Sequence, residues 1–94
     1  MSSRVHINNI MAELARRGLL AELNAIAFQH SVLAQEILGR SHLPCFTEPR
    51  HEWWHHLKSH HIWSDARIAL LHGVHHSTVR AGRAAHVARL QRNA

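Results

Sequence analysis

The stretch SDARIALLHGVHHSTVRAGRAAHVARL, residues 64–90, decides the predicted fold. Ser64 and Asp65 supply an N-cap and an acidic first turn for a short helix that ends before Gly73. A tight turn at this glycine leads into a longer helix, expected over residues 75–91. A short helix, a glycine turn and a long helix in this order predict a helix-turn-helix.

The remainder of the chain has the residue pattern of helices rather than strands. β-Branched residues never line up with a two-residue period, and no Asn-Gly or Asp-Gly hairpin turn occurs. Thr47 and Pro49 mark one helix start, as a cap and as a proline near the first helical position. Apolar spacing and breaker residues predict helices over residues 1–18, 20–30, 33–38 and 48–60, with a loop at 39–47.

The predicted fold class is all-α, a compact bundle of about five to six helices that ends in the helix-turn-helix. Residues 1–18 are expected to form an extra N-terminal helix, and residues 19–94 the helix-turn-helix domain. In the C-terminal half, residues at helical spacing are expected to face the core. These residues are Trp53, Trp54, Leu57, Ile68, Ala69, Leu71, Val79, Gly82, His86 and Leu90.

The chain is small and basic. Eleven Lys and Arg against six Asp and Glu give its 94 residues a formal net charge of +5 with histidine neutral. Asp65 is the last acidic residue, and only basic charges follow it. These are Arg67, Arg80, Arg83, Arg89 and Arg92. A basic C-terminal third predicts a polyanionic partner, most often nucleic acid, and the alternative is a soluble protein whose surface is merely basic.

Cysteine usage and hydropathy bound the cellular compartment. Cys45 is the only cysteine, so no internal disulfide can form, which fits a reducing cytosol. No apolar run approaches membrane-spanning length, and no hydrophobic signal segment follows the N-terminus. The sequence therefore predicts a cytoplasmic protein with no membrane partner.

The segment HEWWHH, residues 51–56, contains H-E-x-x-H, a pattern in which two histidines bind zinc and the glutamate acts as a base. In the longer form of this pattern a glycine lets the chain leave the helix, and Lys58 occupies that position here. On a continuing helix His61 would point roughly 80° away from His51. We therefore expect neither a zinc protease nor a functional metal site. Weak chelation is the alternative for two histidine pairs at i, i+4 spacing, His51/His55 and His56/His60.

No other pattern indicates catalysis. Cys45 follows Pro44 in a predicted loop and has no positioned acid to orient a neighbouring histidine. The chain has no glycine-rich phosphate loop and no Walker lysine, so nucleotide binding is not indicated. The sequence predicts that the protein is not an enzyme and requires no cofactor.

The first turn of the last predicted helix holds four polar residues, His75, His76, Ser77 and Thr78. That turn is the part of a recognition helix that reaches base edges in the major groove. Histidine, serine and threonine can all form hydrogen bonds with bases or phosphates there. The helix N-terminus adds partial positive charge beside the phosphates. These four residues are therefore predicted to contact DNA.

GVHHSTV, residues 73–79, resembles the G-R-D-H-S/T-T-V pattern of the C-terminal, DNA-binding domain of the bacterial replication initiator DnaA. LGRSHLPCFTEPRHEWWHHLK, residues 38–58, is similar to that domain's leucine, basic loop and following helix. WSDARIALLHG, residues 63–73, resembles its L-S-L-P-E-I-G-x-x-F-G segment. The resemblance covers roughly residues 20–90 and implies a fold like that of the Trp repressor.

In the family that it resembles, the basic loop enters the minor groove and the helix-turn-helix reads the major groove. By position, the resemblance gives the loop role to Arg40 and His42. It gives backbone or base contacts on the next helix to Arg50, His51 and Lys58. Ser64 and Asp65 open the first helix of the motif, and the base-reading positions fall on His75, His76, Ser77 and Thr78. Arg80 completes the predicted DNA-binding set.

Two differences from the family pattern bear on function. Val74 and His75 stand where the family has arginine and aspartate. Aspartate would accept a hydrogen bond from cytosine N4, whereas histidine is more apt to donate to a guanine or a phosphate. The chain also has no nucleotide-binding ATPase module. It resembles the free-standing or regulator-fused versions of this domain in alphaproteobacteria and their phage-like elements.

The expected function is sequence-specific binding of double-stranded DNA at the bacterial nucleoid, as a transcription regulator, including of phage-like or gene transfer agent genes. RNA polymerase or other transcription proteins are further expected partners. The alternatives are a replication-accessory DNA-binding protein without ATPase activity and a helical protein-interaction module. The sequence does not fix the oligomeric state.

Overall fold

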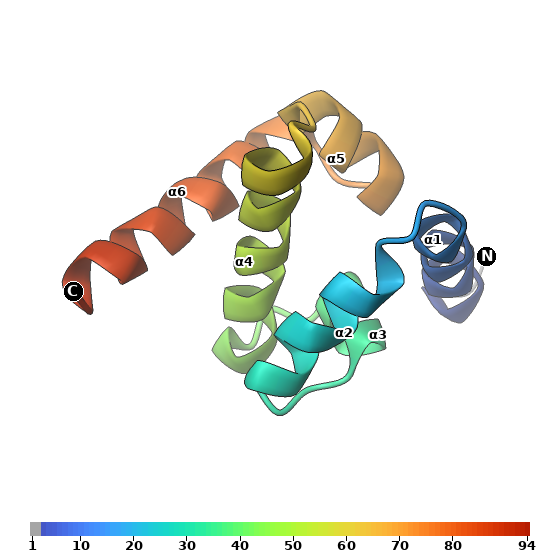
Figure 1. Ribbon diagram of the computed structural model, residues 1–94, viewed down its shortest axis with the longest axis horizontal. Coiled ribbons are helices and arrows are strands. Elements are labelled where there is room, and N and C mark those ends of the chain that lie inside the picture. Colours follow the sequence, from blue (N-terminus) through green and yellow to red (C-terminus); the bar gives the residue numbers. More distant parts are fainter. Residues whose placement is uncertain (1–2) are drawn as a thin grey trace. The chain divides into compact units, whose positions relative to one another are not determined.

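The computed structural model describes residues 3–94 of the chain, with side chains from His6 onward. Within that range the chain forms six helices and no strand, so the all-α prediction is confirmed (Figure 1). In chain order they are α1 (Ser3–Arg16), α2 (Leu20–Gln29), α3 (Ala34–Leu38), α4 (Pro44–His61), α5 (Asp65–His72) and α6 (His76–Arg92). None of them is both long enough and apolar enough to span a bilayer.

Contacts between residues group the chain into an N-terminal unit that ends at Pro49 and a C-terminal unit, residues 50–94. The boundary falls inside α4, whereas the sequence suggested one after residue 18. The helix α1 packs with α2 and α3 in the N-terminal unit. Its predicted glycine stop is confirmed, because Gly18 has a φ of +71°, in the left-handed region that favours glycine.

The core of the N-terminal unit comes from one face of each of α1, α2 and α3. Its buried apolar residues are Ile10, Leu14, Leu19, Leu23, Ile26, Ala27, Ala34, Ile37 and Leu38. Glu36 closes the start of α3 by accepting a 2.8 Å hydrogen bond from the backbone N–H of Leu33. The helices over 20–29 and 34–38 lie within one residue of their predicted bounds.

The start of α4 differs from the prediction. The helix begins at Pro44 rather than after Thr47, and Pro49 lies inside it. Its first turn closes on the Leu43 carbonyl, which accepts from the N–H groups of Phe46 at 2.9 Å and Thr47 at 3.0 Å. Each of the two prolines is compatible with a first helical turn, and the sequence pattern favoured the second. The structure instead places Pro44 first and buries Pro49 completely.

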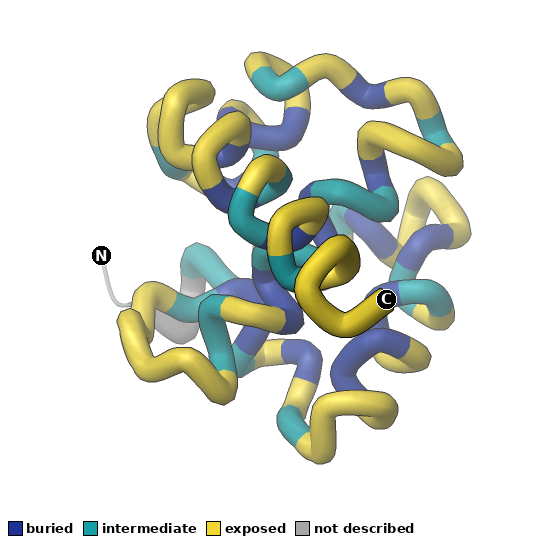
Figure 2. Tube along the Cα trace, turned by 90° about the vertical axis from the view of Figure 1, so that its left-hand side faces the viewer, coloured by how far each residue is buried: buried dark blue, intermediate teal, exposed yellow. Residues whose placement is uncertain are grey.

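The C-terminal unit is built around tryptophans of α4. Trp53 and Leu57 are completely buried, together with Ile68 of α5 and Val79 of α6. Buried stretches alternate with exposed ones along the chain (Figure 2). The Trp53 indole donates a 3.1 Å hydrogen bond to Nε2 of the buried His72. The Nδ1–H of His72 donates to the Ile68 carbonyl at 2.7 Å, because a carbonyl can only accept.

The face of α6 toward the core is shorter than predicted. Val79, Gly82 and His86 are buried as expected, but Leu90 is 53% exposed. Gly82 explains how closely α6 approaches α4, because a Cβ at this position would lie 2.6 Å from Cδ2 of His51 and 2.8 Å from two ring carbons of Trp54. A glycine is therefore required here by space rather than by backbone conformation.

We predict that Gly82→Ala destabilises the protein. Overpacking against buried rings costs about 1–3 kcal/mol, while alanine gains up to about 1 kcal/mol in helix propensity, so a net loss is expected. The measurement is urea unfolding followed by far-ultraviolet circular dichroism.

Gly39→Ala is the matched control for this substitution. A Cβ at Gly39 would meet only the carbonyl oxygens of Gln35 and Glu36, at 3.4 and 3.6 Å, so its stability should be unchanged or slightly raised. Equal stability of Gly82→Ala and the wild type would contradict the close packing of α6 on α4.

Candidate nucleic-acid interface

The charge of the chain is concentrated in the C-terminal unit. Residues 50–94 contain seven Lys and Arg but only two acidic residues, Glu52 and Asp65. Residues 1–49 contain four basic and four acidic residues, so the net charge of +5 comes from the C-terminal unit. This unit also holds nine of the twelve histidines. A polyanion is therefore attracted to the C-terminal unit.

The turn between α5 and α6 has the predicted construction. The Ser64 hydroxyl caps α5 by accepting a 3.1 Å hydrogen bond from the backbone N–H of Arg67. Gly73 ends α5 in the left-handed conformation, with a φ of +69°, and the N–H of Val74 bonds back to the Ala69 carbonyl. The structure thus has a short helix, a glycine turn and a long helix in the expected order.

An ion pair holds α6 against the start of α5. Nε and Nη2 of Arg83 donate to the two carboxylate oxygens of Asp65 at 2.7 and 2.9 Å. These hydrogen bonds lower the pKa of the Asp65 carboxyl. Nε of the exposed Arg80 lies farther away, 3.7 Å from Oδ2. Asp65 is one of the predicted DNA contacts, and in the structure its carboxylate also holds Arg83 of α6.

The four predicted base-reading residues lie together on an exposed turn. His75 is the N-cap of α6, and His76, Ser77 and Thr78 form its first turn. Nδ1 of His75 lies 3.1 Å from the backbone nitrogen of Ser77, which donates to it, and 2.7 Å from the Ser77 hydroxyl oxygen. The rings of His75 and His76 pack with centroids 4.3 Å apart. Capping therefore orders an otherwise exposed set of hydrogen-bonding groups.

The remaining predicted DNA contacts are dispersed. Arg40 and His42 are exposed in the loop before α4, in the N-terminal unit. Lys58 is exposed on α4 and Arg80 on α6. Arg50 is only 9% exposed, and burial lowers the pKa of its guanidinium; its contact with DNA stays a prediction.

The histidines of the H-E-x-x-H segment face α6. Nδ1 of His51 accepts a 3.0 Å hydrogen bond from Nη2 of Arg89, which places the His51 proton on Nε2. A zinc-binding histidine would instead donate its second ring N–H to an acceptor, so this bond disfavours zinc at His51. Among the described residues, His51 and His55 belong to no group of three donors close enough to hold one ion.

His55 lies in the same α4–α6 contact, with its ring centroid 5.1 Å from that of His86. Its Nδ1 is buried without a hydrogen-bond partner, and its Nε2 lies 3.1 Å from the Ser59 hydroxyl. Burial, and then the charge of Arg83, lower the pKa of His55. Sequence analysis missed this polar contact, although the four-residue spacing of His51 and His55 places both on one helix face.

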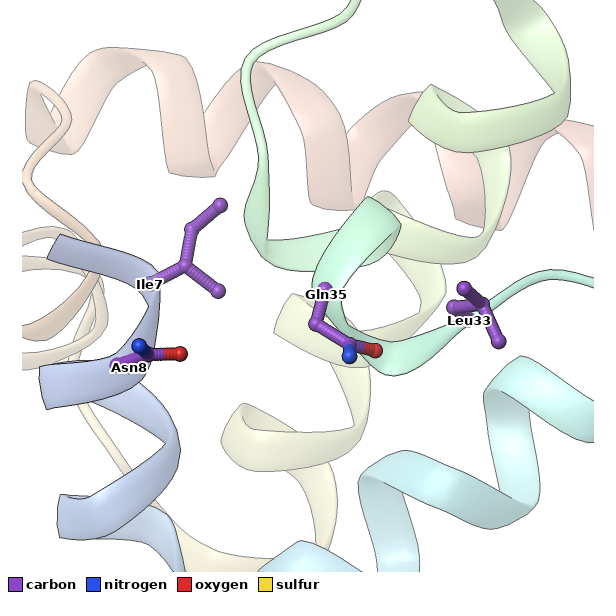
Figure 3. Close-up of a pocket in the computed structure, with 4 residues that line it drawn as sticks. All are labelled: Ile7, Asn8, Leu33 and Gln35. Atoms are coloured by element: carbon purple, nitrogen blue, oxygen red, sulfur yellow. The ribbon is translucent and has the colours of Figure 1, made fainter. Parts of the chain in front are cut away.

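A separate pocket of about 490 Å³ lies in the N-terminal unit (Figure 3). Its lining residues are Ile7, Asn8, Leu33 and Gln35. These side chains supply apolar surface and amide groups but no titratable group. Among the lining residues that the structure describes there is thus no acid, base or nucleophile.

Comparisons with known proteins identify no relative of this chain. No protein-family model, no curated protein and no solved structure matches it.

We predict that Arg83→Gln destabilises the C-terminal unit by about 1–2 kcal/mol, because it removes two charge-assisted hydrogen bonds to a partly buried carboxylate. Arg80→Gln is the matched control on the same helix, and its exposed, longer contact predicts a change below about 0.5 kcal/mol. Urea unfolding followed by tryptophan fluorescence reports on this unit, since all three tryptophans lie in it. Similar losses in both variants would contradict the anchoring role of Arg83.

We also predict that acid weakens the fold through His55. Its folded-state pKa is lowered, so below the free-imidazole value of about 6.5 the unfolded chain binds the proton more readily than the folded one. The contribution of His55 to the free energy of unfolding is therefore fully present above about pH 6.5. It is lost as the pH falls below that value. His55→Gln should reduce this decline in urea unfolding measured between about pH 7.5 and 5. His42→Gln is the exposed control outside α4, and an equal reduction by it would count against His55 as the source.

Proposed function

We propose that this protein binds double-stranded DNA sequence-specifically through the first turn of α6 and acts as a transcription regulator. The observation that carries the proposal is the exposure of His75, His76, Ser77 and Thr78 together on a capped helix start, in the unit that holds the whole net charge of +5. Hydrogen-bonding side chains at this place on a helix suit the major groove.

The physical requirements of DNA binding are divided between two sets of residues. Lys58, Arg67 and Arg80 are exposed and can neutralise phosphates, which gives affinity without sequence preference. The N-terminal turn of α6 adds the positive end of the helix dipole and donors or acceptors for base edges. The Asp65–Arg83 pair restrains α6, so that this turn is presented by an ordered element.

The resemblance to the DNA-binding domain of the initiator DnaA supports the same assignment and suggests the bacterial cytoplasm, at the nucleoid, as the location of the protein. It also suggests RNA polymerase or other transcription proteins as partners. Because His75 replaces the family's aspartate, the target sequence differs from the initiator's own box. Regulated genes would include those of phage-like elements or gene transfer agents.

A helical protein-interaction module is the second candidate. Exposed apolar side chains in the C-terminal unit favour it, since Ile62 is 81% and Leu70 is 85% exposed. These two residues are separated from the polar turn of α6 in sequence and lie outside the predicted DNA contacts. Protein association and DNA binding therefore predict different variants to be damaging.

We predict that selection from random duplex DNA recovers a preferred site, and that log K falls against log salt with a slope of roughly −4 to −5 from about four to six phosphate contacts. His76→Ala should cost about 1–3 kcal/mol on the selected site and much less on random DNA. Arg80→Gln should weaken both and lower the salt slope by about one.

Three results separate the candidates. If His76→Ala lost the same affinity for the selected site and for random DNA, this turn would not read bases. A slope near zero, with no selected sequence, would contradict DNA binding. The interaction module would instead be favoured if Leu70→Ser abolished association with a partner protein while His76→Ala and Arg80→Gln had no effect.

A further inference from the structure

We infer that the backbone of α6 fixes the tautomer of His75, and that this makes the turn a reader of guanine in the major groove, with Ser77 accepting from an amino group beside it. The inference rests on the proposed function and specifies the bases that this turn would recognise. It follows from the two hydrogen bonds that join His75 and Ser77, which together determine where each proton lies.

The backbone N–H of Ser77 determines the first proton. A peptide N–H can only donate, and this one points at Nδ1 of His75 over 3.1 Å. The Nδ1 atom must therefore carry a lone pair. A neutral imidazole has one protonated nitrogen, so the proton of His75 lies on Nε2. The exposed ring thus offers a hydrogen-bond donor at Nε2, in the tautomer that the helix cap requires.

The Ser77 hydroxyl determines the second proton. Its oxygen lies 2.7 Å from the same Nδ1, which has no proton to give. The hydroxyl must therefore donate to Nδ1, sharing the single lone pair of that nitrogen with the backbone N–H, and the Ser77 oxygen keeps its lone pairs for an outside donor. The two residues together present one donor, Nε2–H of His75, and one acceptor, Oγ of Ser77. The hydrogen bonds between these two residues thus determine which exposed group donates and which accepts.

This polarity selects among base edges. Guanine presents two neighbouring acceptors, N7 and O6, to a donor such as Nε2–H. Adenine presents only N7, with the N6 amino donor beside it, and that donor opposes Nε2–H. The imidazole ring and the 2.7 Å bond separate Nε2 from Oγ, so the adjacent N6 and N7 of one adenine cannot satisfy both. We therefore assign guanine to His75, and the amino group of cytosine or adenine to Ser77.

Nuclear magnetic resonance on the DNA-free protein tests the tautomer independently of any DNA. At about pH 8, above the free-imidazole pKa of ~6.5, correlations between the ring ¹⁵N and carbon-bound protons distinguish a protonated from an unprotonated nitrogen. We expect His75 to show an unprotonated Nδ1 and a protonated Nε2. A protonated Nδ1, or equal mixing of the two tautomers, overturns the inference whatever the protein binds.

Binding selection from random duplex DNA tests the base assignment, with wild type, His75→Asp and His60→Asp compared. Aspartate is a good N-cap, and its carboxylate accepts hydrogen bonds where Nε2–H of His75 donates one. His60→Asp is the control, because it makes the same change of charge at an exposed residue of α4 that is distant from α6 in the sequence. We expect a fixed guanine in the wild-type site and in the His60→Asp site. His75→Asp should bind that site roughly 10- to 100-fold more weakly and prefer cytosine at that position.

The possible outcomes keep the two proposals distinguishable. The same guanine in the sites of wild type and His75→Asp overturns the assignment of His75, while sequence-specific binding stands. A fixed base other than guanine in the wild-type site also overturns the assignment of His75 and leaves sequence-specific binding in place. If the wild-type protein selects no sequence, the proposed function and this assignment are overturned together. Circular dichroism on His75→Asp confirms that the comparison is made on folded protein.

Discussion

The close approach of α6 to α4 at Gly82 is the constraint on which the C-terminal unit depends. A side chain at this position would occupy the space of the His51 and Trp54 rings, so the absence of one allows α6 to lie directly on the aromatic face of α4. Val79 and His86, one turn before and one turn after, are also buried, and the His86 ring lies 5.1 Å from that of His55 in α4. The Asp65–Arg83 pair then fixes the N-terminal part of α6 to α5. Close packing and one ion pair together leave the first turn of α6 exposed.

The parts of this arrangement that depend on local chemistry were predictable from the sequence. Ser64 as a cap and Gly73 as a left-handed stop were predicted, because a hydroxyl beside unsatisfied N–H groups and a residue without Cβ have strong local preferences. The bounds of α5 and α6 followed from them. The polar cluster at residues 75–78 was also predictable as a group, since four consecutive residues at a helix start share one turn.

Features decided by packing between helices were not predictable. Two prolines, Pro44 and Pro49, each satisfied the local rules for a helix start, and the first-turn hydrogen bonds to the Leu43 carbonyl show that the first begins α4. Arginine is usually exposed at a protein surface, but Arg50 is buried in this fold. Leu90 continues the apolar spacing of α6 beyond the point where α4 covers it, and so remains exposed. The pairing of Asp65 with Arg83, 18 residues away in the sequence, was also not predicted.

Histidine illustrates why the abundance of one residue type does not by itself specify a function. His72, His75 and His51 occur in one unit, yet different partners determine the proton position in each. The Ile68 carbonyl requires a protonated Nδ1 on His72, whereas a backbone N–H and a guanidinium require an unprotonated Nδ1 on His75 and His51. The buried His72 thereby joins Trp53 to α5 inside the core, and the exposed His75 directs its remaining donor outward. A partner that can only donate or only accept converts a chemically ambiguous ring into a group of defined polarity. In an exposed position such a group can distinguish one base edge from another.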